Sequence, residues 1–351
     1  MLTVMMKEMA HSTVTRKNHS TGTRKSSPRT VKTLPEIIAH RGATYLAPEN
    51  TLTAFQNAIV LGADGVEMDV QQTKDQGLII HHDYLIDLGT EISAKIYDLT
   101  LGELEDIDLT KWNGVNFTTE KLPTLAEALA FCSGLEGCTV QLELKAPILP
   151  DPSFVPRVVE QIRASGLGER LLLVSFRHDL LQQAKELMPE LRVGILTLGS
   201  LPSMMLPPPV LWKDLGLVNS MDGELDEENC PALKKQAGLV ASTISDKLTL
   251  IAALYPQMSV RQIVGTLADQ ADPAAYVQSL SFPVDYVSCE YHTAFQNPEL
   301  VNQLHAVGCK VAFWTVNSKN VVRSLLPLGP DCFVTDRPDS IRVWIAEAEA
   351  E

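Results

Sequence analysis

Two carboxylates stand two residues apart in the apolar segment Val66–Val70, where they are Glu67 and Asp69. Side chains of a β-strand alternate between its two faces, so both carboxylates would point the same way. Two acids on the inner face of a core strand are costly unless a cation neutralises them. Oxygen ligands suit Mg²⁺ or Ca²⁺ better than zinc. The pair therefore predicts a metal site, and salt bridges within the core are the alternative.

A third carboxylate, Glu143, lies in the segment QLELK, with Lys145 two residues further along the chain. The same alternation would bring both side chains to one strand face. Glu67, Asp69 and Glu143 would then offer three oxygen ligands and leave open positions for water and substrate. Lys145 would neutralise a non-bridging phosphate oxygen. Alternatively, Lys145 would form a structural ion pair with Glu143.

Histidines close two of the predicted strands. His40 closes the first and is followed by Arg41 and Gly42, and the pair His81-His82 closes another. A histidine there can transfer protons, an arginine can hold phosphate oxygens, and a glycine lets the backbone approach a ligand. Only one of two adjacent histidines can face the site, and the residues alone do not decide between His81 and His82.

The segments that would position these residues are nine short apolar runs, separated for the most part by helical patterns. They are Ile37–His40, Val66–Val70, Leu78–His81, Thr139–Leu144, Leu171–Phe176, Arg192–Leu196, Val284–Ser288, Val311–Val316 and Cys332–Thr335. Only seven residues separate Val70 from Leu78, and a parallel crossover needs roughly a dozen, so Leu78–His81 should fold back beside its predecessor. The other eight strands predict an α/β fold, the (β/α)₈ TIM barrel, whose active sites lie at the C-terminal strand ends.

Helices should cover the barrel between the strands. One is expected to begin at Asn50 or Thr51 and to end near Gly62, and another should begin with Thr124 as its cap. These residues can accept hydrogen bonds from the free N–H groups of the first helical turn.

Residues 35–345 are predicted to form the barrel domain, which includes a long segment at 198–282. Because most connections between strands and helices are much shorter, we expect this segment to be an inserted, mainly helical subdomain or lid. Amphipathic patterns at Ser245–Leu254 and Ser259–Leu267 predict two of its helices.

Charge is distributed unevenly along the chain. Residues 1–34 contain seven lysines and arginines against one glutamate, although the whole chain has a net charge of -14. We expect residues 1–34 to be a disordered basic tail in a cytoplasmic protein, or a targeting segment if the protein is organellar. The acidic remainder would repel polyanions, which argues against nucleic acid as a partner. No apolar run approaches the roughly 20 residues that a transmembrane helix needs.

Six short motifs occur in a fixed order along the chain. They are HRGATYLAPENTLTAF, GADGVEMDVQQTKD, IIHHD, LELK, WTVN and TDRP. In this combination the chain resembles the glycerophosphodiester phosphodiesterase family over roughly residues 36–340, apart from the insertion. The resemblance implies the barrel shared with phosphatidylinositol-specific phospholipases. It also implies hydrolysis of a glycerophosphodiester, such as glycerophosphocholine or glycerophosphoethanolamine, to glycerol 3-phosphate and an alcohol.

The resemblance assigns roles to individual residues. The family's catalytic acid and base correspond, in either order, to His40 and to His82, the histidine directly before Asp83. Its metal ligands correspond to Glu67, Asp69 and Glu143. Its phosphate contacts correspond to Arg41 and Lys145. One departure is the turn Asp75-Gln76-Gly77, which is one residue longer than the usual Asp-Gly and could shift His82.

Three further residues have two interpretations each. Trp314, in WTVN, would line the glycerol pocket or lie in the core. Glu49, in the PENT corner, would lie behind the metal ligands or reach the metal itself. Asp336, in TDRP, would bind Arg41 or cap the last helix.

Two other functions stay open. The same site could serve a phosphodiesterase of the lysophospholipase D type or one directed at sphingolipids. An apolar groove formed by Leu248, Ile251, Leu254 and Ile263 would favour this, and a closed polar pocket would oppose it. The second is a catalytically inactive barrel that acts as a binding module, which the complete set of catalytic positions opposes.

Overall fold

The computed structural model describes most of the chain from residue 34 onward. The described residues are 34–87, 93–105, 107, 109, 111–112, 115–116, 120–145, 151–198, 212–226, 228–231, 248, 251–252 and 258–350. The predicted basic tail therefore lies outside them, apart from Leu34. Within the described part of the chain, no helix is long and apolar enough to cross a membrane.

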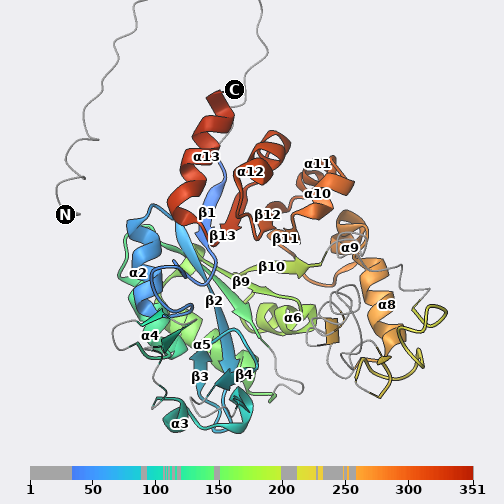
Figure 1. Cartoon of the computed structure of the whole chain (residues 1–351), viewed down its shortest axis with the longest axis horizontal. Helices are drawn as coiled ribbons and strands as arrows, with labels where there is room; N and C mark the ends of the chain where they lie inside the picture. The colour runs from blue at the N-terminus through green and yellow to red at the C-terminus, as the bar shows by residue number, and fades with distance from the viewer. Residues whose placement is uncertain are drawn as a thin grey trace, which may run out of the picture. The chain divides into compact units, whose positions relative to one another are not determined.

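Eight parallel strands form a closed barrel at the centre of residues 34–351 (Figure 1). They are β1 (Glu36–Ala39), β2 (Gly65–Gln72), β8 (Thr139–Leu144), β9 (Leu171–Ser175), β10 (Arg192–Thr197), β11 (Tyr286–Glu290), β12 (Lys310–Trp314) and β13 (Cys332–Thr335). Each strand pairs with the next in this order, and β13 pairs with β1 to close the ring. This confirms the predicted (β/α)₈ barrel.

The ninth predicted strand lies beside the barrel rather than in it. β3 (Leu78–Ile80) pairs antiparallel with β2, as the short connection predicts. The backbone N–H of His81 donates to the carbonyl oxygen of Asp69 at 2.9 Å just beyond this pairing. In the longer turn, Gln76 adopts a φ of 65° and accepts a hydrogen bond from Arg157.

Helices surround the strands (Figure 1). They are α2 (Leu52–Val60), α3 (Leu101–Glu105), α4 (Leu125–Ser133), α5 (Phe154–Ser165), α6 (His178–Leu187), α8 (Val260–Asp269), α9 (Pro273–Ser279), α10 (His292–Gln296), α11 (Leu300–Ala306), α12 (Lys319–Leu325) and α13 (Pro338–Ala350). Thr51 caps α2, and Thr124 forms a capping box with Glu127 at the start of α4. Both predicted caps are confirmed.

Short elements complete the described chain. They are the antiparallel pairs β4 (Leu85–Asp87) with β5 (Ser93–Lys95) and β6 (Lys111–Trp112) with β7 (Val115–Asn116), and the 3₁₀ turns Ile96–Asp98, Gly168–Arg170 and Leu326–Leu328. The sequence patterns predicted none of these, because each spans only two or three residues and has no period to recognise.

The described part of the insertion has an apolar core of its own. Ser259 caps α8, which confirms the start of the second predicted helix, whereas most of Ser245–Leu254 lies outside the described residues. Leu248, Ile251 and Ile263 are fully buried in this core together with other residues of the insertion. Phe176 and Trp314 of the barrel pack against the same core. The described part of the insertion therefore packs against the C-terminal ends of β9 and β12.

Candidate active site

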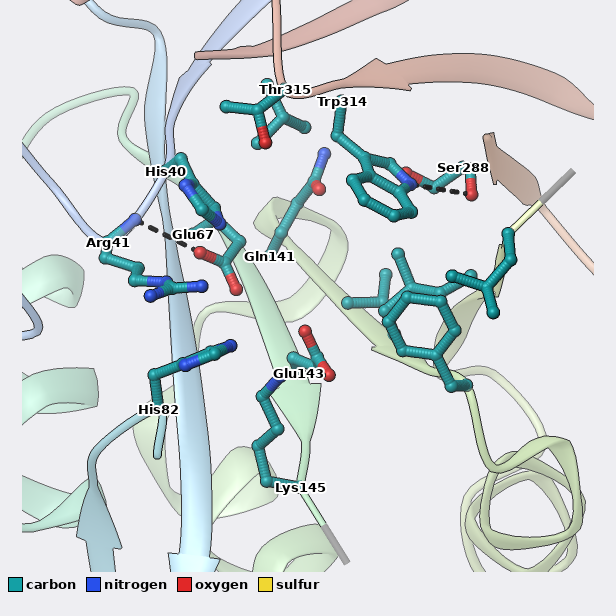
Figure 2. A pocket seen from close by; sticks show the side chains of 15 residues that line it. His40, Arg41, Glu67, His82, Gln141, Glu143, Lys145, Ser288, Trp314 and Thr315 are labelled. Atoms are coloured by element: carbon teal, nitrogen blue, oxygen red, sulfur yellow. Dashed lines mark hydrogen bonds and ion pairs between the residues drawn. The ribbon is translucent and has the colours of Figure 1, made fainter. Parts of the chain in front are cut away.

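A pocket with a volume of about 230 Å³ opens at the C-terminal ends of the barrel strands (Figure 2). Its charged side is lined by residues from β1, β2, β3 and β8 or from the positions just after them. They are His40, Arg41, Glu67, His82, Glu143 and Lys145. Trp314 and Ser288 lie on the opposite side of the same view. The barrel thus brings together residues that stand far apart in the sequence, at the end where such barrels place their sites.

Three carboxylates meet at this pocket, and two of them, Glu67 and Glu143, line it. Glu67, Asp69 and Glu143 are all buried, and one oxygen of each lies within 4.8 Å of an oxygen of both others. β2 and β8 pair in register, with Asp69 opposite Glu143, so the predicted alternation brings the carboxylates to one place. Within the described residues this is the one cluster of three potential ligands.

Two cations and an amide balance part of this charge. Lys145 Nζ lies 2.8 Å from Glu143 Oε1 and 3.5 Å from Asp69 Oδ1, and Arg41 Nε lies 3.6 Å from Asp69 Oδ2. Asn50 donates to Asp69 Oδ2 at 2.9 Å. The ion pair of Lys145 with Glu143 thus exists, and both side chains also line the pocket.

The pKa values of the three acids differ. Burial and the charges of Asp69 and Glu143 raise the pKa of Glu67 well above its usual value. Burial also raises the pKa of Glu143, although Lys145 opposes this. For Asp69, burial is outweighed by Lys145, His82 and Arg41, which hold its pKa below the usual range. The neighbouring cations and hydrogen-bond donors therefore do not fully stabilise the negative charge of the three carboxylates.

A divalent cation fits this cluster. Asp69 Oδ1 is buried and accepts no hydrogen bond. A buried acceptor without a hydrogen bond lowers the stability of the folded protein. With Glu49 beside Arg41, the site has four carboxylates against the two cations Arg41 and Lys145. Oxygen donors in this number are those that Mg²⁺ and Ca²⁺ prefer.

Each pocket histidine has a carboxylate on the Nδ1 side of its ring. His40 Nδ1 lies 2.7 Å from Asp336 Oδ1, and His82 Nδ1 lies 2.7 Å from Asp83 Oδ1. Such a carboxylate holds the proton on Nδ1, so Nε2 is the nitrogen left for chemistry. Burial and the charge of Lys145 lower the pKa of His82 to about 4.

Asp336 has contacts that neither of its expected roles included. It contacts His40, and it also accepts a hydrogen bond from the side-chain amide of Asn317 at 2.5 Å. The same Asn317 accepts from the backbone N–H of Asp336 at 2.8 Å. The motifs WTVN and TDRP therefore meet behind His40, where Asn317 fixes the carboxylate that orients the imidazole.

The two adjacent histidines face different surroundings. His82 lines the pocket, whereas His81 is buried with 4% of its surface exposed and is not among the lining residues.

Trp314 also lines the pocket, while Glu49 contacts Arg41 at 3.2 Å and lies outside the three-carboxylate cluster.

Gly42 lies against helix α2. Its φ is 86°, and a Cβ atom at this position would lie 2.7 Å from backbone and side-chain atoms of Ala54. The glycine thus permits close approach of the turn to α2. Arg41, just before it, has a φ of 56° and donates its backbone N–H to Glu67 at 3.1 Å.

Comparison with known proteins identifies the family of this chain. The model of the glycerophosphoryl diester phosphodiesterase family matches residues 40–340. The chain belongs to this family. A glycerophosphodiester phosphodiesterase of Caldanaerobacter subterraneus is 37% identical over 166 residues, which are 47% of this chain and 67% of the relative.

Solved structures share the barrel. A glycerophosphodiester phosphodiesterase from Parabacteroides distasonis matches with a TM-score of 0.58 and 20% identity over 91% of this chain and all of the other. An Oleispira antarctica phosphodiesterase, solved with the product sn-glycerol-3-phosphate, matches with a TM-score of 0.56 and 23% identity over 89% and 97%. At these identities the likeness shows the fold.

In this member of the family, one wall of the pocket is apolar. It is formed by Val174, Phe176, Leu196, Leu198, Trp314 and Val334. The rings of Phe176 and Trp314 meet edge to face with their centroids 5.8 Å apart, and Trp314 Nε1 donates to the carbonyl oxygen of Ser288. Leu248, Ile251 and Ile263 do not line the pocket, so these three residues do not form the apolar groove that would favour a lysophospholipid or sphingolipid substrate. Leu254 lies outside the described residues.

Sequence reasoning missed several residues of this family member's site. Phe176, Gln141 and Ser288 line the pocket, and Asn317 orients Asp336. Gln141 could have been found, because it precedes Glu143 by two residues on the same strand face. Phe176 and Ser288 carry no signal that separates them from residues of the barrel core.

Proposed function

We propose that this chain is a metal-dependent phosphodiesterase that hydrolyses glycerophosphodiesters to glycerol 3-phosphate and an alcohol. The observation that carries the proposal is the buried cluster of Glu67, Asp69 and Glu143 within a pocket that also holds two histidines. The family membership and the activity of the Caldanaerobacter relative support the same reaction.

Glu67, Asp69 and Glu143 would hold the divalent metal, which we propose to be Mg²⁺ or Ca²⁺. When bound, the metal supplies Lewis-acid stabilisation of the charge on the phosphoryl oxygens. Asn50 holds one oxygen of Asp69 by its hydrogen bond and thereby orients the carboxylate toward the cluster.

Arg41 and Lys145 would bind the phosphate. Both line the pocket next to the carboxylates, and both are held there by ion pairs with them. Their charges would lie beside the phosphoryl oxygens, where negative charge increases in the transition state. Glu49 would keep the guanidinium of Arg41 in place through its contact with Nη1.

His40 and His82 would transfer the protons. One would deprotonate the attacking hydroxyl, either of water or of the neighbouring glycerol carbon, and the other would protonate the leaving alkoxide. In both histidines the carboxylate at Nδ1 leaves Nε2 for the substrate. Both histidines line the pocket together with Glu67 and Glu143, so a general base and a general acid would be available beside the proposed metal site.

A second candidate substrate class is favoured by the apolar wall. Phe176, Leu196 and Trp314 line the same pocket as the charged residues and could accept the hydrocarbon part of a lysophospholipid or sphingolipid. The scissile phosphate would lie on the same catalytic residues in either case. A barrel that only binds ligands would not require two histidines whose Nδ1 atoms are each held by a carboxylate.

A product assay tests the proposal. The full chain is incubated with glycerophosphocholine, glycerophosphoethanolamine and a lysophosphatidylcholine, and the phosphorus products are identified by ³¹P NMR. Release of glycerol 3-phosphate supports the main proposal, and release of lysophosphatidic acid in preference to it supports the second. Absence of turnover on all three with Mg²⁺ and with Ca²⁺ would contradict both.

A further inference from the structure

We propose that Gln71 is a positioning residue for the proton carrier His82. Its side-chain amide holds the backbone of residues 81–83 from below, and this directs the imidazole into the pocket. The inference rests on the proposed function, because it gives Gln71 a role in the same reaction.

Gln71 continues a row of inward-facing residues on β2. Strand alternation places it on the face of Glu67 and Asp69, and only 1% of its surface is exposed. Its Nε2 donates to three consecutive carbonyl oxygens, at 2.7 Å to His81, 3.2 Å to His82 and 2.8 Å to Asp83. Three acceptors around one atom require the NH₂ end of the amide, whose two hydrogens they share.

The segment needs this support because it has left the sheet. β3 ends at Ile80. The last backbone hydrogen bond that joins this end of β3 to β2 runs from the N–H of His81 to the carbonyl oxygen of Asp69. By contrast, the backbone N–H of His40 still bonds to Thr335 across the parallel pairing of β1 and β13. The barrel therefore holds His40 directly, whereas the backbone at His82 depends on a side chain.

One amide can fix both members of the His82 pair. Asp83 accepts at His82 Nδ1, and both residues belong to the segment whose carbonyls Gln71 binds. The Asp83 side chain is 67% exposed, so the pair by itself gains little rigidity from its contact. Without the donor, three carbonyls would lose a partner and the segment could turn toward water.

The test compares two neighbouring glutamines of the same strand. Gln71→Met keeps the length of the side chain and removes its donor. Gln72→Met is the matched control, because Gln72 is also buried but points to the other face and bonds to Ser153. We expect Gln71→Met to lower kcat by about 10- to 100-fold with little change in KM, since a small misplacement of a catalytic group acts on the chemical step. Gln72→Met should retain kcat within about twofold.

Two further readouts separate positioning from a general structural effect. Metal affinity measured by calorimetry should be unchanged in Gln71→Met, because the three carboxylates are intact. In a double-mutant cycle read under single-turnover conditions, Gln71→Met should cause little further loss in a His82→Ala background. A role in stability alone would cause the same loss of rate in both backgrounds.

Unchanged kcat in Gln71→Met, or an equal loss with and without His82, would overturn the inference. If Gln71→Met does not fold, Gln71→Asn keeps the amide but shortens its reach, and a folded Gln71→Asn enzyme with wild-type kcat would overturn it equally. An inactive wild-type protein would overturn the proposed function and the positioning role together. An active wild type with an unaffected Gln71 variant would overturn the positioning role alone.

Discussion

Two Asp–His contacts of the same length differ in how their carboxylates are held. Asp336, which orients His40, is itself fixed by Asn317, whereas Asp83 is the exposed neighbour of His82 and forms no side-chain hydrogen bond with any other described residue. In the described structure, His40 thus belongs to a chain of three side chains that follow the ends of β1, β13 and β12. Its imidazole should be the more rigid of the two.

Replacing Asp336 with Asn should reduce kcat by roughly 100-fold. An amide can donate to Nδ1, which would move the imidazole proton to Nε2, the nitrogen that faces the pocket. Steady-state kinetics on glycerophosphocholine would measure the effect. Asp331→Asn is the control, because Asp331 contacts His305 at the same 2.7 Å but outside the pocket. Equal losses of kcat in the two variants would contradict the role of Asp336.

Sequence reasoning identified the residues that carry charge and missed their partners. Glu67 and Asp69 could be predicted because strand alternation alone puts them together. The contact of Asp336 with His40 spans 296 positions and exists only because β13 closes the barrel against β1. No local pattern encodes such a contact, so the motif TDRP could be recognised without its role being understood.

At the scale of elements, the turn from β1 into α2 sets the position of both His40 and Arg41. The backbone N–H of Ala43 bonds to the carbonyl of Ala54, which joins the turn to α2. A Cβ atom at Gly42 would lie 2.7 Å from atoms of Ala54, so the turn has no room for a side chain here. The placement of the two site residues therefore depends on a position without a side chain.

Gly42→Ala should destabilise the protein by roughly 2 kcal/mol more than Gly308→Ala. Both glycines have a φ of 86°, so both variants suffer the same backbone strain. Only at Gly42 would the new methyl group meet other atoms, since nothing lies within 4 Å of the Cβ position at Gly308. Urea unfolding of the two variants measures the difference. Equal stability would show that the turn relaxes without cost.

Most elements of the barrel could be predicted, for a physical reason. Buried parallel strands are short runs of β-branched residues, and the observed bounds of β8 and β13 match the predicted segments at both ends. The helix caps Thr51 and Thr124 followed from their side-chain chemistry. The pairs β4–β5 and β6–β7 could not be predicted, because two or three residues show no alternation.

At the scale of the whole molecule, the insertion bears on the site through the barrel's own residues. Phe176 and Trp314 line the pocket on one side and pack against the core of the insertion on the other. His178, at the start of α6, adds a second connection. Its Nδ1 contacts the hydroxyl of Tyr276 in α9 at 2.7 Å, and its Nε2 contacts the carbonyl of Leu196 at 3.1 Å.

The buried His178 should make stability fall in mild acid. Burial lowers its pKa from 6.5 to about 4 in the folded chain, so between these values the unfolded chain binds more protons. Its contribution to stability is present above pH 6.5 and is lost as the pH falls toward 4. Between pH 7 and pH 5 the loss should be about 2 kcal/mol.

His178→Gln isolates this contribution. Glutamine can still donate to Leu196 and accept from Tyr276, but it does not titrate. Urea unfolding at pH 7 and pH 5, with chelator present throughout, should show a smaller acid loss in the variant than in the wild type. An identical acid loss in both proteins would mean that His178 titrates normally in the folded state.

The length of the segment 198–282 predicted an insertion, but not where it would lie. Its apolar residues indicated amphipathic helices, and the described residues Leu248, Ile251 and Ile263 belong to one core and do not line the pocket. An apolar helical face can cover a neighbouring helix or a ligand, and sequence does not distinguish the two. The apolar wall of the pocket comes mainly from the barrel strands, and from the segment it includes Leu198, the first residue.

The central claim is that Glu67, Asp69 and Glu143 hold a metal on which turnover depends. The measurement that tests it most directly is the release of glycerol 3-phosphate from glycerophosphocholine after full chelation and after add-back of Mg²⁺ or Ca²⁺. We expect turnover to cease with chelator, to return with metal in the wild type, and not to return in Asp69→Asn. Turnover that survives full chelation, or that is the same in Asp69→Asn as in the wild type, would contradict the account.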